Sequence, residues 1–339
     1  MPLLKTIDEL KSYVALDTKR ILPSIALELA TWEAGTIAPL LGAPLLTWLQ
    51  AAYDAPGFDP AGAGLAAQLL RAVQAALARL AVATGLTTHQ VSVDETGLHI
   101  TSTDTSKTAF QWQSNQLQAL LLARGQADLD ALVQWLEDHH ADAPELQAWA
   151  ASPAGRRHRR ELFTSTSDFQ ECQNISTSRA VFEALGPVRR QLEAFELGPV
   201  LGLDFLQELR EQVRTRALTS ENENLLRTYV YPALASLTIG HVAPELGLSL
   251  GGDGISLTIA RVDDSNAKEA DAGLDQLLAS KATNARLAGA RYLRQLTGYL
   301  DRTASATRFA TYFASSAYTA PNQVVTPLNT PDSKTYKFC

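Results

Sequence analysis

Apolar residues recur three and four positions apart along most of the chain, which is the spacing of helices that bury one face. In the first half this pattern predicts helices over residues 18–31, 37–52, 65–83, 106–124 and 128–139. In the second half it predicts helices between residues 267 and 300. The chain is therefore expected to be mainly helical.

The period of the pattern changes from about 3.6 residues to 2 at two places, which predicts a β-hairpin in each half of the chain. Apolar and polar residues alternate on both sides of a short turn that ends at Gly97, and they do so again around Gly254. Glycine suits such turns because it adopts the positive φ that they often require. We expect the hairpins near residues 89–102 and 246–260.

The two halves are related by an internal duplication. Residues 69–100 align with residues 226–257 without a gap, and both the residue class and the alternation match. Two further blocks keep the same order along the chain: 39–42 aligns with 199–202, and 129–137 aligns with 293–301. Trp149 aligns with Phe313 at the same spacing as the second of these blocks. The spacing changes only between the blocks, where loops tolerate insertions. An internal repeat of this kind determines the architecture.

These patterns predict an α+β protein, mainly α, built from two tandem homologous units that are each a helical bundle with an inserted β-hairpin. The total length of 339 residues suits two domains. We expect the first repeat in residues 1–155, a junction in 156–177 and the second repeat in 178–316. The remaining residues, 317–339, are rich in Pro, Thr, Asn and Ser. Such a tail buries little by itself and is disordered or docks on another surface.

Composition narrows the classes of function. An apolar share of 46% with 19% charged residues is typical of a soluble globular chain, and a net charge of −7 argues against a general nucleic-acid binder. Two cysteines do not make a disulfide framework. The N-terminus lacks the apolar core of a signal peptide, and the most apolar stretch, 63–83, is interrupted by polar residues at regular intervals. We therefore predict a soluble, unprocessed protein without a membrane span.

The densest cluster of metal-capable side chains consists of Glu137, Asp138, His139, His140 and Asp142. Adjacent histidines point about 100° apart on a helix, so the two imidazoles do not share one metal ion as an i,i+4 pair would. The second repeat keeps only one carboxylate at the equivalent positions. The cluster is interpreted as a solvated helix end, and we expect neither a metal nor another cofactor.

Nothing in the sequence supports catalysis. It contains no Walker, G-x-G-x-x-G, G-x-S-x-G or H-E-x-x-H motif, and Cys172 has no signature of a nucleophile around it. A lone cysteine is more often a small core residue. We expect no catalytic residue and no enzyme activity, while an enzyme of a class without short motifs stays open as an alternative.

One charge run falls in the expected junction, and it comprises Arg156, Arg157, Arg159 and Arg160. Such a run contacts phosphate or an acidic partner surface in some proteins and is a solvated linker in others. If this chain binds a polyanion, the sequence favours this run as the contact.

The chain resembles a family of uncharacterised duplicated proteins of Bacteroidota phages and prophages, usually placed among head–tail connector, or neck, proteins. Three features carry the resemblance: the proline–glycine helix segment, the Ala/Leu helix that leads into a hairpin, and the stretch 163–182 that opens the second copy. It spans most of residues 5–316. It implies a mostly helical adaptor that forms a ring between portal and tail, in a virion neck assembled in the bacterial cytoplasm.

The expected partners are other copies of the chain in a ring and other phage structural proteins, with DNA at most passing through a channel and no membrane. The hairpins near Gly97 and Gly254 and the tail residues Tyr336 and Phe338 are candidate subunit contacts, because strands and flexible tails lock neighbouring subunits together. A component of a phage-derived tail or contractile injection machine is the alternative, and a motif-less enzyme is the second alternative.

Overall fold

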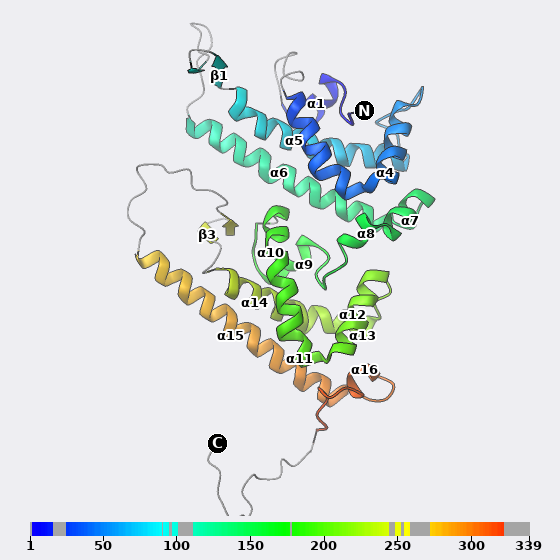
Figure 1. Ribbon diagram of the computed structural model, residues 1–339, viewed down its shortest axis with the longest axis vertical. Helices are drawn as coiled ribbons and strands as arrows, with labels where there is room; N and C mark the ends of the chain where they lie inside the picture. Colours follow the sequence, from blue (N-terminus) through cyan, green and yellow to red (C-terminus); the bar gives the residue numbers. More distant parts are fainter. Residues whose placement is uncertain are drawn as a thin grey trace, which may run out of the picture. The chain divides into compact units, whose positions relative to one another are not determined.

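The computed structural model describes residues 2–15, 25–89, 91–94, 97–100, 111–176, 178–243, 248–251, 254–257 and 272–321 (Figure 1). Contacts divide the chain into two compact units. The first comprises residues 1–186 and 245–267, and the second comprises residues 187–244 and 268–339. The units are defined by contacts and the repeats by sequence similarity, so their boundaries differ.

The core of the first unit lies between two long helices, α5 (Leu65–His89) and α6 (Gln111–Asp138), which run side by side in Figure 1. The apolar face of α5 is buried against α6 and against the helices that precede it. The shorter helices of this unit are α1 (Ile7–Tyr13), α3 (Ala26–Trp32), η1 (Glu33–Ile37), α4 (Ala38–Asp54), α7 (Pro144–Ala151), α8 (Pro153–Arg157) and α9 (Thr166–Cys172). The next helix, α10 (Arg179–Leu192), passes from the first unit into the second.

The second unit repeats this arrangement. Its core lies between α14 (Tyr231–Val242), which is buried on nearly all sides, and the long helix α15 (Ala272–Thr303) (Figure 1). The remaining helices are η2 (Glu193–Leu197), α11 (Gly198–Leu201), α12 (Leu203–Thr215), α13 (Ser220–Leu225), η3 (Leu226–Val230) and α16 (Ala310–Phe313).

The α+β class expected from the sequence is wrong, because the protein is all-α. Helices make up roughly three quarters of the described residues. The only extended pairs among them are β1 (Val91–Asp94) with β2 (Gly97–Ile100) and β3 (Leu248–Gly251) with β4 (Gly254–Leu257). Two-stranded ribbons of this length are marginal by themselves, and the buried apolar side chains that the structure describes lie in helices and in the segments that join them. The core is therefore helix packed on helix.

Glycines inside the long helices mark the point where the two core helices cross. The sequence predicted a break near residue 125, yet α6 continues through Gly125 as one helix. A Cβ on Gly125 would lie 2.6 Å from Leu80 Cγ on α5, and a Cβ on Gly289 would lie 2.5 Å from Leu237 Cγ on α14. Leu80 and Leu237 are equivalent in the sequence repeat. The same close helix crossing is thus built twice.

We expect Gly289→Ala to destabilise the protein by about 1–2 kcal/mol. The clash with Leu237 costs roughly 1–3 kcal/mol, and the better helix propensity of alanine offsets up to about 1 kcal/mol of it. Gly298→Ala in the same helix is the matched control, since the nearest atom to its Cβ would be Arg302 Nη1 at 3.6 Å. That control is expected to gain up to about 1 kcal/mol. Urea denaturation measures both, and a Gly289→Ala variant as stable as the control would contradict the close crossing.

Both repeats bend at the same place. In each, a five-residue π-helix, η1 or η2, leads into a short helical turn that ends at a glycine of positive φ. Gly42 has φ +71° and ψ 156°, and Gly202 has φ +75° and ψ 144°. Only glycine adopts this backbone without strain. The Pro–Leu–Leu–Gly and Pro–Val–Leu–Gly blocks of the sequence repeat are explained by this bend.

The stretch expected as the junction contains a counterpart of the first helix. Helix α9 begins after the N-cap Ser165, whose side chain accepts a hydrogen bond from the Asp168 N–H, as that of Thr6 does from the Glu9 N–H before α1. Phe169 is fully buried in α9, and Leu10 is fully buried in α1. The similarity of the two halves therefore extends upstream of the aligned sequence blocks, into residues that belong to the first compact unit.

One position of the sequence alignment is corrected by the hydrogen bonds. Trp149 was aligned with Phe313, but the structural counterpart of Trp149 is Tyr312. Both residues are buried, and the carbonyl of each accepts a bond from the hydroxyl of a serine three residues later, at 2.6 Å from Ser152 and 2.7 Å from Ser315. Phe313 is 38% exposed. The loop before α16 differs in length by one residue from its counterpart before α7, and this difference shifts the register. Sequence similarity alone did not show it.

Candidate interaction surfaces

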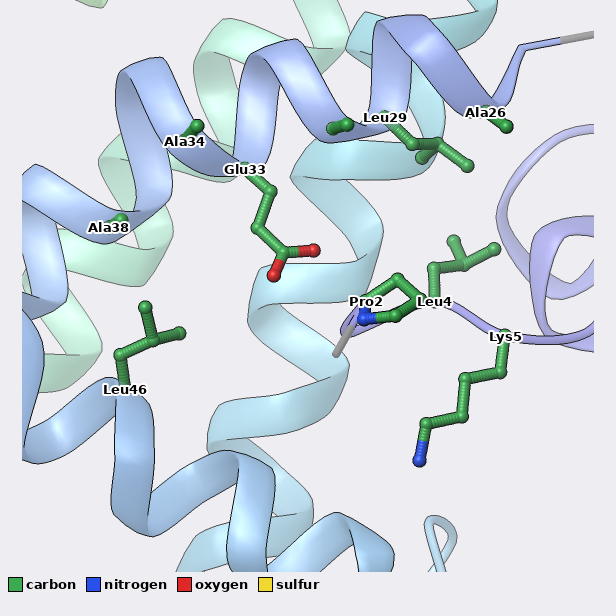
Figure 2. A pocket seen from close by; sticks show the side chains of 10 residues that line it. Pro2, Leu4, Lys5, Ala26, Leu29, Glu33, Ala34, Ala38 and Leu46 are labelled. Atoms are coloured by element: carbon green, nitrogen blue, oxygen red, sulfur yellow. The ribbon is translucent and has the colours of Figure 1, made fainter.

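The first unit carries an open apolar groove with a volume of about 810 Å³ (Figure 2). One wall is the continuous run from α3 through η1 into α4, where alanines recur every fourth residue and so line one face: Ala26, Ala30, Ala34 and Ala38. The other wall is formed by Pro2 and Leu4 of the N-terminal segment and by Leu46 of α4. Small side chains on one wall leave the space that larger residues would fill.

The charged groups at this groove are engaged within the chain. The carboxylate of Glu33 accepts a hydrogen bond from the Leu3 N–H at 3.0 Å, which ties the N-terminal segment to η1. The ammonium of Lys5 forms an ion pair with Asp54 and lies 3.8 Å from the centroid of the Tyr53 ring. What the groove offers is therefore mainly apolar surface, which suits an apolar side chain better than a charged substrate.

The second unit presents an apolar ridge made of Phe195, Pro199 and Leu203. The three residues are spaced by four, and all three are exposed, with Phe195 at 71% and Leu203 at 75%. Leu203 Cδ2 lies beside the backbone of Gly198, so the ridge follows the bend between η2 and α12. At the two outer positions the first repeat has Gly35 and Ala43. One repeat is therefore flat where the other protrudes.

Sequence reasoning missed both surfaces, although each left a signal. Four alanines at four-residue intervals precede the Pro39–Gly42 block, and the Gly35-to-Phe195 and Ala43-to-Leu203 differences stand out when the repeats are aligned. Neither signal is distinctive by itself, because alanine and leucine are common in the long helices of this chain.

The side chains of the metal-capable cluster are used separately. Glu137 accepts a hydrogen bond from Arg159 Nε at 2.7 Å, and the His139 ring stacks on Trp135 with centroids 4.4 Å apart. His140 Nδ1 lies 2.7 Å from the Glu137 carbonyl oxygen. Over the described part of the chain, no group of three or more His, Cys, Asp or Glu side chains is placed to hold a metal ion.

The arginine run is only partly available to a partner. Arg156 and Arg157 are exposed on α8. Arg159 forms an ion pair with Glu137 at 2.6 Å, and Arg160 lies 3.7 Å from a carboxylate oxygen of Glu161. The structure thus brings Arg156, Arg157 and Arg160 to the surface and uses Arg159 to join α6 to the chain after α8. Whether the run contacts a polyanion stays a prediction.

The environment of Cys172 does not favour a nucleophile. Burial raises the pKa of its thiol to about 11, and the nearby carboxylates of Glu171 and Asp168 add to the shift. The thiolate is the reactive form, so at neutral pH this cysteine is almost wholly unreactive.

The side chains of the other residues expected at subunit contacts lie outside the described part of the structure. Gly97 begins β2 and Gly254 begins β4, and only the backbone of these ribbons is described. Tyr336 and Phe338 lie outside the described residues.

In α5, the stretch Leu65–Leu86 is long and apolar enough to cross a membrane, but 67% of that stretch is buried inside the protein, as in a core helix.

The duplicated helical architecture agrees with a comparison to known families. The model of a family of unknown function, DUF6712, matches residues 37–159 and, separately, residues 197–322. The chain belongs to this family. The two matched regions agree with the internal duplication and with the expected likeness to an uncharacterised duplicated family. No curated protein and no solved structure matches the chain.

Proposed function

We propose that this DUF6712 protein is a structural assembly protein that forms a homo-oligomeric ring, and that the ring belongs to the head–tail connector of a phage or prophage. The observation that carries the proposal is the pairing of an apolar groove on the first repeat with an exposed apolar ridge on the second repeat of the same chain.

The ridge supplies the driving force. Removing a phenylalanine or leucine side chain from water stabilises a contact by about 1.5–3 kcal/mol each. Phe195 and Leu203 are both more than two-thirds exposed, so most of this free energy is still available for association. The alanine-lined groove offers an apolar surface with room for such side chains.

The position of the two surfaces sets the kind of assembly. The groove and the ridge lie on different repeats, so every copy has one of each. A contact between two different surfaces is heterologous, and successive head-to-tail contacts close into a ring when the rotation permits. The phage connector role is the finer part of the proposal and rests on the sequence resemblance. Neighbouring genes for a capsid and a portal protein would support it, whereas a sheath gene without them would favour an injection machine.

The mass in solution tests the ring. We expect the full chain to elute as an oligomer in size-exclusion chromatography with light scattering, and Leu203→Asp to reduce it to a monomer by placing a charge in an apolar contact. Leu287→Asp, at an exposed leucine of the same unit away from the ridge, is the matched control and should stay oligomeric. A monomeric wild type at high concentration, or equal loss in both variants, would overturn the proposal.

A mixing experiment tests the head-to-tail geometry. Ala30→Trp fills the groove and leaves the ridge intact, while Leu203→Asp damages the ridge and leaves the groove intact. Each variant alone is expected to be monomeric. Mixed together, they should form a 1:1 dimer and nothing larger, because only one competent contact remains. An isologous interface, or one elsewhere on the chain, would give no such dimer.

A further inference from the structure

Helix α15 has a basic surface in an acidic protein. The chain has a net charge of −7, yet residues 276–300 contain no Asp or Glu and carry Lys281, Arg286, Arg291 and Arg294. Arg302 follows in the last turn of the helix. Arg291, Arg294 and Arg302 are exposed, and they fall within about one third of the helix circumference. This face of α15 therefore carries three positive charges along a stretch of helix that has no carboxylate between residues 276 and 300.

A pocket of about 460 Å³ lies on this face, and it is lined by Tyr229, Arg294, Gln295, Gly298 and Arg302. Gly298 keeps it open, because the residue between the two arginines has no side chain. The Tyr229 ring stacks on Tyr299 with centroids 5.1 Å apart, which holds it at the edge of the pocket. The pocket therefore combines two guanidinium groups with an amide and a phenol, all of which donate hydrogen bonds.

The two guanidinium groups have no acceptor in the described part of the second unit. Elsewhere in this unit arginines pair with carboxylates: Arg210 with Glu193, Arg214 with Glu211, Arg227 with Glu223 and Arg308 with Glu221. For Arg294 and Arg302 no acceptor is found among the residues that the structure describes. In the first repeat, the sequence alignment places Asp130 and Asp138 at these positions. A fold built twice with opposite charges here does not require the arginines, so their use lies outside folding.

We infer that this pocket binds the phosphate groups of a DNA backbone. Arginine presents a planar fork of donors that matches phosphate oxygens. The backbones of the two arginines are about 12 Å apart along the helix, and Arg302 Nη1 reaches back toward Gly298, so both guanidinium groups face the same pocket. A phosphodiester chain offers a phosphate at every nucleotide and so supplies oxygens at both arginines whatever its sequence, whereas an acidic peptide needs carboxylates at one particular spacing. The contact reads no base and is therefore independent of sequence.

This site goes beyond the proposed ring and does not depend on it, because both arginines belong to one subunit. If the ring forms, the site gives each subunit a contact to DNA passing along the assembly. The local charge then outweighs the net negative charge of the chain, since fields of exposed charges farther than about 8–10 Å are screened at physiological ionic strength.

Fluorescence anisotropy with a labelled 30-base-pair duplex tests the inference on the full chain. For wild type, log K should fall with log[salt], and Arg294→Gln with Arg302→Gln should reduce that slope by about 1.8, or 0.9 for each lost phosphate contact. Affinity at low salt should fall at least tenfold. The matched control, Arg214→Gln with Arg227→Gln, removes the same charge from paired arginines of the same unit and should change affinity less than threefold.

Three outcomes would overturn the inference. They are an equal loss in both double variants, no measurable binding of the duplex by wild type, or binding of poly-glutamate with the same affinity and the same dependence on Arg294 and Arg302, which would assign the pocket to an acidic protein. Light scattering on the double variant keeps this result separate from the proposed function, because its oligomer should persist.

Discussion

Replacing Trp149 with alanine is expected to lower the free energy of unfolding by about 3–5 kcal/mol. The Trp149 side chain is almost fully buried, and its Nε1–H donates a hydrogen bond to the Leu40 carbonyl at 3.0 Å. That bond joins α7 to the turn before Gly42, where the backbone has positive φ. The substitution removes the ring and leaves the Leu40 carbonyl without this donor, so a cavity and a lost bond act together.

Urea denaturation followed by circular dichroism measures this loss. Trp112→Ala is the matched control, since Trp112 is 63% exposed at the start of α6 and its removal should change stability by less than about 0.5 kcal/mol. Similar losses for the two variants would show that α7 does not anchor the bend.

Acidification from pH 7 to pH 4 is expected to remove about 3 kcal/mol of stability through His158. Burial lowers the pKa of this imidazole to about 4, and the neighbouring Arg179 guanidinium lowers it further than Glu137 raises it. Arg179 Nη2 lies 3.2 Å from His158 Nδ1, and because arginine only donates, Nδ1 accepts and the ring is neutral. A proton on Nδ1 would remove that bond and set two cations side by side.

Stability falls on acidification because the proton binds to His158 in the unfolded chain first. The folded pKa lies below the unfolded value of 6.5, so as the pH falls the unfolded chain takes up the proton first. The contribution of His158 to the free energy of unfolding is complete above pH 6.5 and is lost as the pH falls to 4. Because carboxylates titrate in the same range, the measurement is the difference between wild type and His158→Gln in urea midpoints at pH 7, 5.5 and 4. Parallel pH profiles for the two proteins would contradict the prediction.

His158 also shows what a local pattern leaves out. In the sequence it is the centre of a basic run that favours contact with an outside polyanion. In the structure its imidazole is mostly buried near Trp149, and Arg159 beside it pairs with Glu137 on α6. The partners of these side chains are 9 and 22 residues away, so a run of like charge does not reveal them.

The sequence by itself determined the duplication and the mainly helical character, because both depend on local rules. Helical periodicity and the alternation about Gly97 and Gly254 are properties of short segments. The tertiary structure alone decided that the protein is all-α, because each described strand pairs only with the other strand of its own hairpin, and the buried apolar side chains that the structure describes lie in helices and in the segments that join them. It also decided which glycines lie at a helix crossing, which arginines have partners and where an apolar groove opens. These depend on distances between segments far apart in the chain, and helix packing sets those distances.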